Sequence, residues 1–213
     1  KGLSDSLKGR FELLRSTHWT LAEMNTAFDY DLERFLLRGG YPGAASLAEQ
    51  DRWFAYMNDS IIEATIAQDV LQLETVRKPA LLKRLFELGA LYSGQELSYR
   101  KILGQLDDKG NTDTIAHYLD LLSGAGMLAG LQKHNAKQLE TRRSSPRFMV
   151  YDTSLMTAAW RDDSSHLLDD PALRGRLTES AVGAYLLARS KREGFEVRWW
   201  REGSKEVDFV LKQ

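Results

Sequence analysis

The chain has 213 residues, 43% of them hydrophobic, which is enough to bury a core as one large domain or two small ones. Its 29 lysines and arginines oppose 30 acidic residues, and the resulting net charge of -1 excludes a global field that would attract nucleic acid or an anionic membrane. The lack of cysteine excludes disulfides and thiolate metal sites, and no apolar run approaches the roughly 18 residues that span a bilayer. We therefore expect a cytoplasmic protein without membrane contact, in which any DNA binding comes from a local patch.

Both ends of the sequence resemble cuts in a longer protein. The chain opens at Lys1 without an initiator methionine, and it ends at Gln213 directly after an apolar, strand-like run. We expect a fragment.

The first third of the chain predicts a short strand followed by helices. Residues 10–16 are short and mixed in polarity, as in a strand, and Thr20 with Glu23 forms a capping box that begins a helix. Glycines and a proline at 39–42 indicate a turn. Over 49–76, apolar residues recur at the three- and four-residue spacing of one helix face: Trp53, Tyr56, Met57, Ile61, Ala64, Thr65 and Val70. Residues 20–76 are therefore predicted to be mostly helical.

The middle of the chain predicts three helices and a hairpin. Pro79 opens a helix that ends near Gly89, a shorter helix covers 97–106, and Asn111 or Thr112 caps a third that ends at the glycines of 124–126. Strands are predicted over 128–133 and 147–151, around a polar, basic loop. This is the order of elements in a winged helix.

The last part of the chain predicts a helix and two strands after an irregular stretch. Residues 151–173 show no clear period, and a helix follows over about 174–192. Strands are predicted over 196–201 and 206–211. In the second strand, period-two alternation would place Glu206, Asp208 and Val210 on one face and Val207, Phe209 and Leu211 on the other.

Six motifs occur in an order that resembles a known family. They are SDSLKGRFELLRSTHWTLAEM (4–24), LLRGGYP (36–42), the winged-helix pattern, VYDTSL (150–155), RLTESAVGAYLL (176–187) and WWREGSKEVDFVL (199–211). Together they resemble the carboxy-terminal two-thirds of a bacterial and archaeal family of AAA+-like ATPases that carry a winged helix and a PD-(D/E)XK-like domain. The resemblance implies a helix-rich α+β fold with the end of an ATPase core (1–24), a helical connector (25–78), a winged helix (79–150) and a partial restriction-endonuclease-like α/β unit (151–213).

The resemblance also implies that the nucleotide site lies before Lys1. No G-x-x-x-x-G-K-[ST] loop, which would cradle phosphates with backbone N–H groups and a lysine, occurs in the chain. ATP and Mg²⁺ are expected to serve the parent protein and not to bind this chain, whose first partner would be the missing ATPase core. Arg10 is a candidate contact to a γ-phosphate across a subunit boundary in a homo-oligomer, or else an exposed strand arginine.

The winged helix offers a candidate DNA contact in its wing. Its third helix has no Lys or Arg and two acidic residues, which makes it a poor reader of the major groove. The wing region carries five basic residues that could hold DNA phosphates in a salt-dependent manner: Lys133, Lys137, Arg142, Arg143 and Arg147. A solvated loop, or a winged helix that contacts protein, explains the same residues.

Two carboxylates near the end form a candidate nuclease pair. In a PD-(D/E)XK core, which the tail resembles, Glu179 would be the helix acid and Asp208 the strand acid, with Asp208 as a ligand of Mg²⁺ or Mn²⁺. The Glu-x-Lys that this chemistry also needs would come after Gln213, so the chain holds at most half of the site. Alternatively, Glu206 and Asp208 pair with Arg201 or Lys205, and Glu179 stabilises its helix dipole.

These inferences lead to three hypotheses about function. The first is a carboxy-terminal part of an AAA+-like ATP-binding protein that supplies DNA- or partner-contacting domains and is not itself catalytic. The second is part of a metal-dependent nuclease with a regulatory ATPase. The third is a non-catalytic protein-interaction scaffold.

Overall fold

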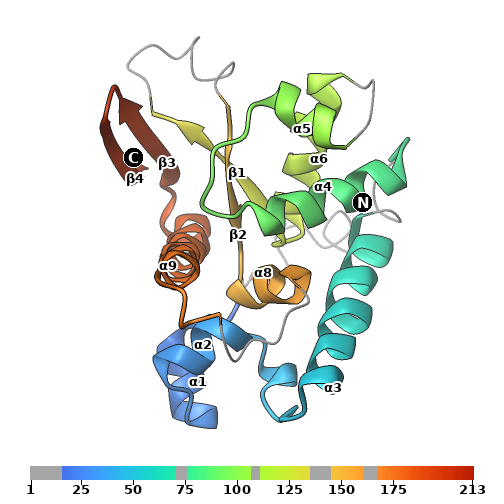
Figure 1. The fold of residues 1–213 in the computed structure, drawn as a ribbon, viewed down its shortest axis with the longest axis vertical. Helices are drawn as coiled ribbons and strands as arrows, with labels where there is room; N and C mark the ends of the chain where they lie inside the picture. Colours follow the sequence, from blue (N-terminus) through green and yellow to red (C-terminus); the bar gives the residue numbers. More distant parts are fainter. Residues whose placement is uncertain (1–15, 71–75, 107–110, 135–144, 161–166) are drawn as a thin grey trace, which may run out of the picture.

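The computed structural model describes residues 16–70, 76–106, 111–134, 145–160 and 167–213. These residues form a helix-rich α+β structure around one four-stranded mixed sheet, which confirms the predicted helix-rich α+β class (Figure 1). The expected strand from residue 10 and the candidate residue Arg10 lie outside the described residues.

Two short helices begin the described chain. In α1 (Leu21–Phe28) the predicted capping box is present: the Glu23 backbone N–H donates to the Thr20 hydroxyl, and the Glu23 carboxylate accepts from the Thr20 backbone N–H at 2.7 Å. Asp31 caps α2 (Leu32–Arg38), and a short 3₁₀ turn, η1 (Pro42–Ala44), follows the glycine pair. The local capping chemistry therefore sets where these helices begin.

A long helical rod follows, and most of it is wound more loosely than an α-helix. It runs through α3 (Gln50–Ala55), η2 (Tyr56–Glu63) and η3 (Thr65–Val70), of which the last two are π-helical. The core residues on it are spaced four and five apart: Trp53, Met57, Ile62, Ile66 and Val70. The predicted α-helical face included Ile61 and Thr65 instead, and the prediction was wrong there because the wider π turn brings Ile62 and Ile66 inward.

Three helices and a hairpin occupy the middle of the chain in the predicted order. They are α4 (Pro79–Leu91), α5 (Tyr99–Gln105), α6 (Thr112–Gly124), β1 (Leu128–Lys133) and β2 (Arg147–Val150). Asn111 caps α6, with its side chain accepting from the Asp113 backbone N–H at 3.0 Å. The hairpin is antiparallel, with Leu128 opposite Val150 and Leu131 opposite Arg147.

An additional helix, α8 (Thr153–Trp160), lies where the sequence predicted irregular structure. Every residue from Thr153 to Ala158 is buried, so the helix has no polar face and no amphipathic period. It packs against α2 and α4, in the centre of Figure 1. Helix α9 (Pro171–Glu193) begins earlier than predicted because Asp170 caps it, and Gly194 ends it in the left-handed conformation.

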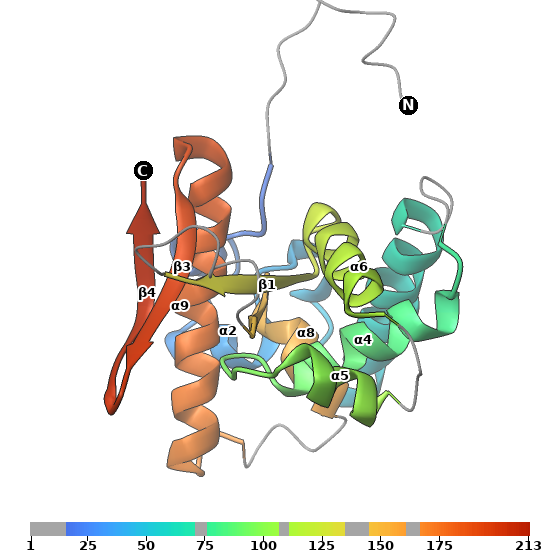
Figure 2. The ribbon, with the colours of Figure 1, turned by 90° about the horizontal axis from the view of Figure 1, so that it is seen from above.

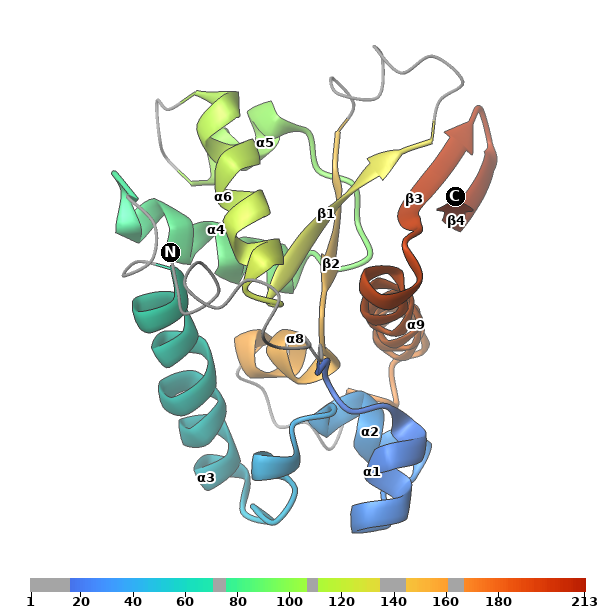
Figure 3. The same cartoon turned by 180° about the vertical axis from the view of Figure 1, so that it is seen from behind.

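The sheet joins the hairpin to the last two strands. β3 (Glu196–Glu202) and β4 (Lys205–Lys212) are antiparallel, β1 pairs with β3 in parallel, and the strand order is β2-β1-β3-β4. The sheet therefore continues across the boundary that was expected at Val150. Figures 2 and 3 show α4 and α6 on one side of the hairpin and α9 on the other, so both faces of β2 are covered.

A bulge in β4 changes which residues share a face. Between the pairs Arg198–Val210 and Trp200–Val207, the single residue Trp199 faces two residues of β4, Asp208 and Phe209. Phe209 packs against the cluster that contains Trp199, while Asp208 reaches the neighbouring Arg147. The predicted separation of these two side chains by strict alternation was therefore wrong.

Within the described residues, no helix is long and apolar enough to cross a membrane.

Candidate functional site

Arg147, at the start of β2, is the centre of a buried polar network. Its side chain is only 3% exposed, and its neighbours along the strand alternate between two cores: Phe148 and Val150 face α4 and α6, while Met149 faces α9. Arg147 lies on the same side as Met149. A charged side chain in so apolar a strand requires a charged partner, because an unpaired buried ion is costly.

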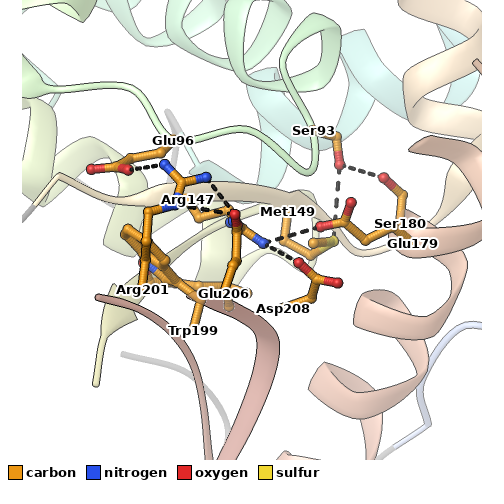
Figure 4. A network of polar contacts seen from close by, with 11 residues as sticks. Ser93, Glu96, Arg147, Met149, Glu179, Ser180, Trp199, Arg201, Glu206 and Asp208 are labelled. Carbon is orange, nitrogen blue, oxygen red and sulfur yellow. Dashed lines mark hydrogen bonds and ion pairs between the residues drawn. The ribbon is translucent and has the colours of Figure 1, made fainter. Parts of the chain in front are cut away.

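Three carboxylates supply that pairing, as Figure 4 shows. The Arg147 Nη1 lies 2.9 Å from the Asp208 Oδ1 and 3.3 Å from the Glu179 Oε1, and its Nη2 pairs with Glu206. The four side chains come from β2, α9 and β4. The structure thus brings Glu179 and Asp208 together, as the candidate nuclease pair would require, but it brings them to a guanidinium.

Trp199 and Arg201 extend the network, Trp199 by its contact with Arg147 and Arg201 by its pairing with Glu206. The Arg147 Cζ lies 5.0 Å from the centroid of the fully buried Trp199 ring, and the Trp199 Nε1 donates to the Leu131 carbonyl at 3.1 Å. Arg201 donates from Nε to Glu206 at 3.1 Å and pairs from Nη1 with Glu96 at 3.4 Å. The sequence alternative that paired Glu206 with Arg201 is therefore present, whereas Asp208 pairs with Arg147.

The network forms the wall of an open pocket of about 660 Å³. Ser98, Lys101 and Ser145 add polar groups to it, and Gly94 closes one side at a φ of +81°. A Cβ on Gly94 would lie 3.3 Å from the Glu179 Oε2, so a side chain at this position would crowd the carboxylate.

Electrostatics within the pocket disfavour the charged form of Glu179. Burial raises the pKa of the Glu179 carboxyl, and the nearby charge of Asp208 raises it further, while Arg147 and Arg176 oppose the shift. Four carboxylates line the pocket, against the three cations Lys101, Arg147 and Arg201: Glu96, Glu179, Glu206 and Asp208. The site therefore carries an excess of negative charge around a fixed internal cation.

This arrangement does not fit a divalent metal ion. The Glu179 and Asp208 oxygens that would bind Mg²⁺ or Mn²⁺ already contact the Arg147 Nη1, whose positive charge would repel a metal ion placed between them. Within the described residues, no group of three or more His, Cys, Asp or Glu side chains is arranged to hold a metal ion. We therefore derive no metal-dependent step from this pocket.

The basic residues predicted in the wing have different environments. Lys133, at the end of β1, is half-buried, with its Nζ 5.6 Å from the centroid of the Trp199 ring. Lys137, Arg142 and Arg143 lie outside the described residues. Arg147, which the sequence grouped with them, points into the carboxylate network and not toward solvent.

A second network joins the second and the fourth of the six motifs, which lie far apart in the sequence. The buried Asp152 accepts from the Gly40 backbone N–H at 2.7 Å through Oδ2, and from the Ser154 backbone N–H at 2.9 Å through Oδ1. Gly40 in turn accepts from the Trp19 backbone N–H at 3.1 Å. This network ties 36–42 to 150–155, and burial lowers the pKa of the neighbouring His18 while Asp152 opposes that shift.

The sequence did not predict that Arg147 and Asp152 each lie at the centre of a polar network, although a signal for each was present. Arg147 opens the apolar run RFMVY, and Asp152 follows that run directly. A lone charge next to a strand that is apolar on both faces indicates a buried partner, but nothing in the spacing identifies that partner.

Comparison with known protein families assigns most of the chain. A family model described as a domain of unknown function (DUF8612) matches residues 29–166, which is more than half of the chain. No curated protein and no solved structure matches. The matched range includes Arg147 and Asp152 but ends before Glu179, Glu206 and Asp208.

Proposed function

The chain belongs to the DUF8612 family, and we propose that it supplies the DNA- or partner-contacting part of an AAA+-like ATP-binding protein and is not itself catalytic. The resemblance of the six motifs supports the ATPase parent, in which ATP and Mg²⁺ would serve the core that precedes this chain. The part from α4 to β2 has the element order of a winged helix, and the part from α9 to β4 has that of a partial PD-(D/E)XK-like unit.

The observation that carries the proposal is the engagement of Glu179, Glu206 and Asp208 by Arg147. Arg147 belongs to the winged-helix-like part and the carboxylates belong to the nuclease-like part, so their ion pairs join the two parts. The parallel pairing of β1 with β3 joins them a second time. The two parts are therefore suited to contact a partner as one body.

DNA is the partner that the wing residues favour. Lys133, Lys137, Arg142 and Arg143 would contact phosphates without reading bases, and such contacts weaken steeply with salt. The test is the fluorescence anisotropy of a labelled DNA duplex titrated with the chain at several salt concentrations. Wild type should bind at low salt, and the double variant Arg142→Ala and Arg143→Ala should bind more weakly and with a shallower salt dependence.

The control for this test is Arg52→Ala with Arg100→Ala, which removes the same charge from exposed helix positions outside the wing. Binding that is absent at low salt, or that both double variants weaken equally, would remove the wing from the proposal. A partner protein would then be the remaining contact.

A metal-dependent nuclease is the second candidate, because Glu179 and Asp208 line one open pocket. It predicts Mg²⁺-dependent cleavage of DNA that Asp208→Asn abolishes. We expect no such cleavage. Cleavage by wild type that is lost in Asp208→Asn would replace the proposed binding role with a catalytic one.

A further inference from the structure

Two arginines on α2 line a small pocket remote from the carboxylate network. Arg34 and Arg38 are four residues apart, so they lie on one face of the helix, one turn from each other. The pocket has a volume of about 330 Å³ and is completed by Tyr30, Leu47 and Ala48. All five residues lie within the range that the family model matches.

Neutral groups hold both guanidinium groups in place. The Arg34 Cζ lies 4.2 Å from the centroid of the Tyr30 ring, and its Nη2 donates to the Ala45 carbonyl at 3.0 Å. The Arg38 Cζ lies 4.7 Å from the centroid of the Trp53 ring, and its Nη2 donates to the Gln50 Oε1 at 2.7 Å. These contacts restrict the orientation of each cation, yet none of them neutralises its charge.

The two positive charges are uncompensated in the described part of the chain. No carboxylate there forms an ion pair with Arg34 or Arg38, and the buried Arg38 Nη1 has no hydrogen-bond acceptor. Burial lowers the pKa of the Arg38 guanidinium, and Arg34 lowers it further, while Tyr30 opposes the shift. Like charges one turn apart destabilise a helix, and a buried donor without an acceptor also costs stability.

We propose that this pocket binds a phosphate group, either as free phosphate or as part of a phosphorylated small molecule such as a nucleotide. A single carboxylate is satisfied by one guanidinium, which it can bind through two parallel hydrogen bonds. Two guanidinium groups that share a pocket match a dianion with several oxygens, so that each arginine donates to different oxygens. This site is independent of the proposed role of the wing.

Isothermal titration calorimetry tests the proposal with inorganic phosphate, pyrophosphate and ATP as separate titrants at low salt. Wild type should bind at least one of them saturably. Arg34→Gln and Arg38→Gln should each weaken that binding by about tenfold or more, which is the loss expected for one charge-assisted contact. Arg34 is exposed, so its variant should fold even if Arg38→Gln does not. Equal affinity for phosphate and ATP would identify free phosphate, and a clear preference for ATP would identify a nucleotide.

The matched control is Arg52→Gln, which removes the same charge from an exposed position on α3 that does not line the pocket. Its affinity should equal that of wild type. The proposal is overturned if no titrant binds with a Kd below about 10 mM, or if Arg52→Gln weakens binding as much as Arg34→Gln. Succinate that binds as tightly as phosphate would also overturn it, in favour of a carboxylate ligand.

Discussion

The Arg147 guanidinium of β2 and the Glu179 carboxylate of α9 lie 3.3 Å apart, across the junction between the hairpin and the carboxy-terminal unit. Asp208 lies 2.9 Å from the same nitrogen atom. The two carboxylates that resemble a nuclease pair in the sequence are therefore both ion-pair partners of Arg147. The stability of the network and its pH dependence are therefore the first properties to measure.

Replacing Arg147 by methionine should destabilise the chain strongly. The substitution keeps the apolar stem but leaves Glu179, Glu206 and Asp208 without their common cation. Because these carboxylates remain partly exposed to solvent, we expect a loss of about 1 to 3 kcal/mol. Urea unfolding followed by circular dichroism measures the loss. Arg100→Met, at an exposed position of α5, is the matched control and should change the free energy of unfolding by less than about 0.5 kcal/mol. Equal losses in both variants would show that Arg147 is not the centre of the network.

Replacing Glu179 by glutamine should stabilise the chain in a pH-dependent manner. The pKa of Glu179 is raised above its ordinary value of 4.5, chiefly by burial, so the folded state favours the protonated form. The contribution of Glu179 to stability is therefore fully present below pH 4.5 and is lost as the pH rises through its raised pKa.

Thermal unfolding of wild type and Glu179→Gln between acidic and neutral pH measures this difference. The two proteins should have the same melting temperature at the acidic end, and the variant should be the more stable at neutral pH. Glu63→Gln, an exposed pair partner of Lys83, is the control. A variant that is less stable than wild type at neutral pH would mean that the ion pair with Arg147 outweighs burial.

Asp152→Asn should destabilise the connection between the two motifs. An amide can offer only one acceptor oxygen, so either the Gly40 or the Ser154 backbone N–H would face an NH₂ group, and a buried donor left without an acceptor costs about 1 to 3 kcal/mol. Chemical unfolding of the variant gives the cost. The exposed Asp59→Asn is the control and should have little effect. A loss no larger than that of the control would contradict the role assigned to Asp152.

Substitution by alanine should change the stability of the chain in opposite directions at two glycines. A Cβ on Gly40 would collide with the backbone carbonyl oxygen of Trp19, which cannot move without breaking the contact between the two segments. A Cβ on Gly104, within α5, would meet nothing within 4 Å, so alanine there should stabilise the helix by up to about 1 kcal/mol. The melting temperature should fall in Gly40→Ala and rise in Gly104→Ala. A Gly40→Ala variant as stable as wild type would contradict the close approach of Gly40 to Trp19.

Elements set by local chemistry could be predicted from the sequence. The Thr20–Glu23 capping box, the Asn111 cap and the two strands of the hairpin lie where the sequence indicated, because capping and alternation depend on residues only a few positions apart. The helix-rich α+β class followed from the sum of these signals.

The remaining features depend on distant neighbours, which spacing does not reveal. Helix α8 is buried on all sides, so it lacks the amphipathic pattern that identifies a helix. The π-helical winding after Ala55 and the bulge at Asp208 each shift the register by one residue. Arg147 finds its partners on α9 and β4, at positions 32 to 61 residues away, and a sequence cannot show that they meet there.

Titration of wild type with Mn²⁺ by isothermal calorimetry, at neutral pH, tests most directly whether Arg147 keeps the carboxylates from a metal-dependent role. We predict no saturable binding in wild type, since Glu179, Glu206 and Asp208 already pair with Arg147, whose positive charge would repel a metal ion placed among them. One Mn²⁺ bound per chain with a submillimolar Kd, and lost in Asp208→Asn, would contradict this account.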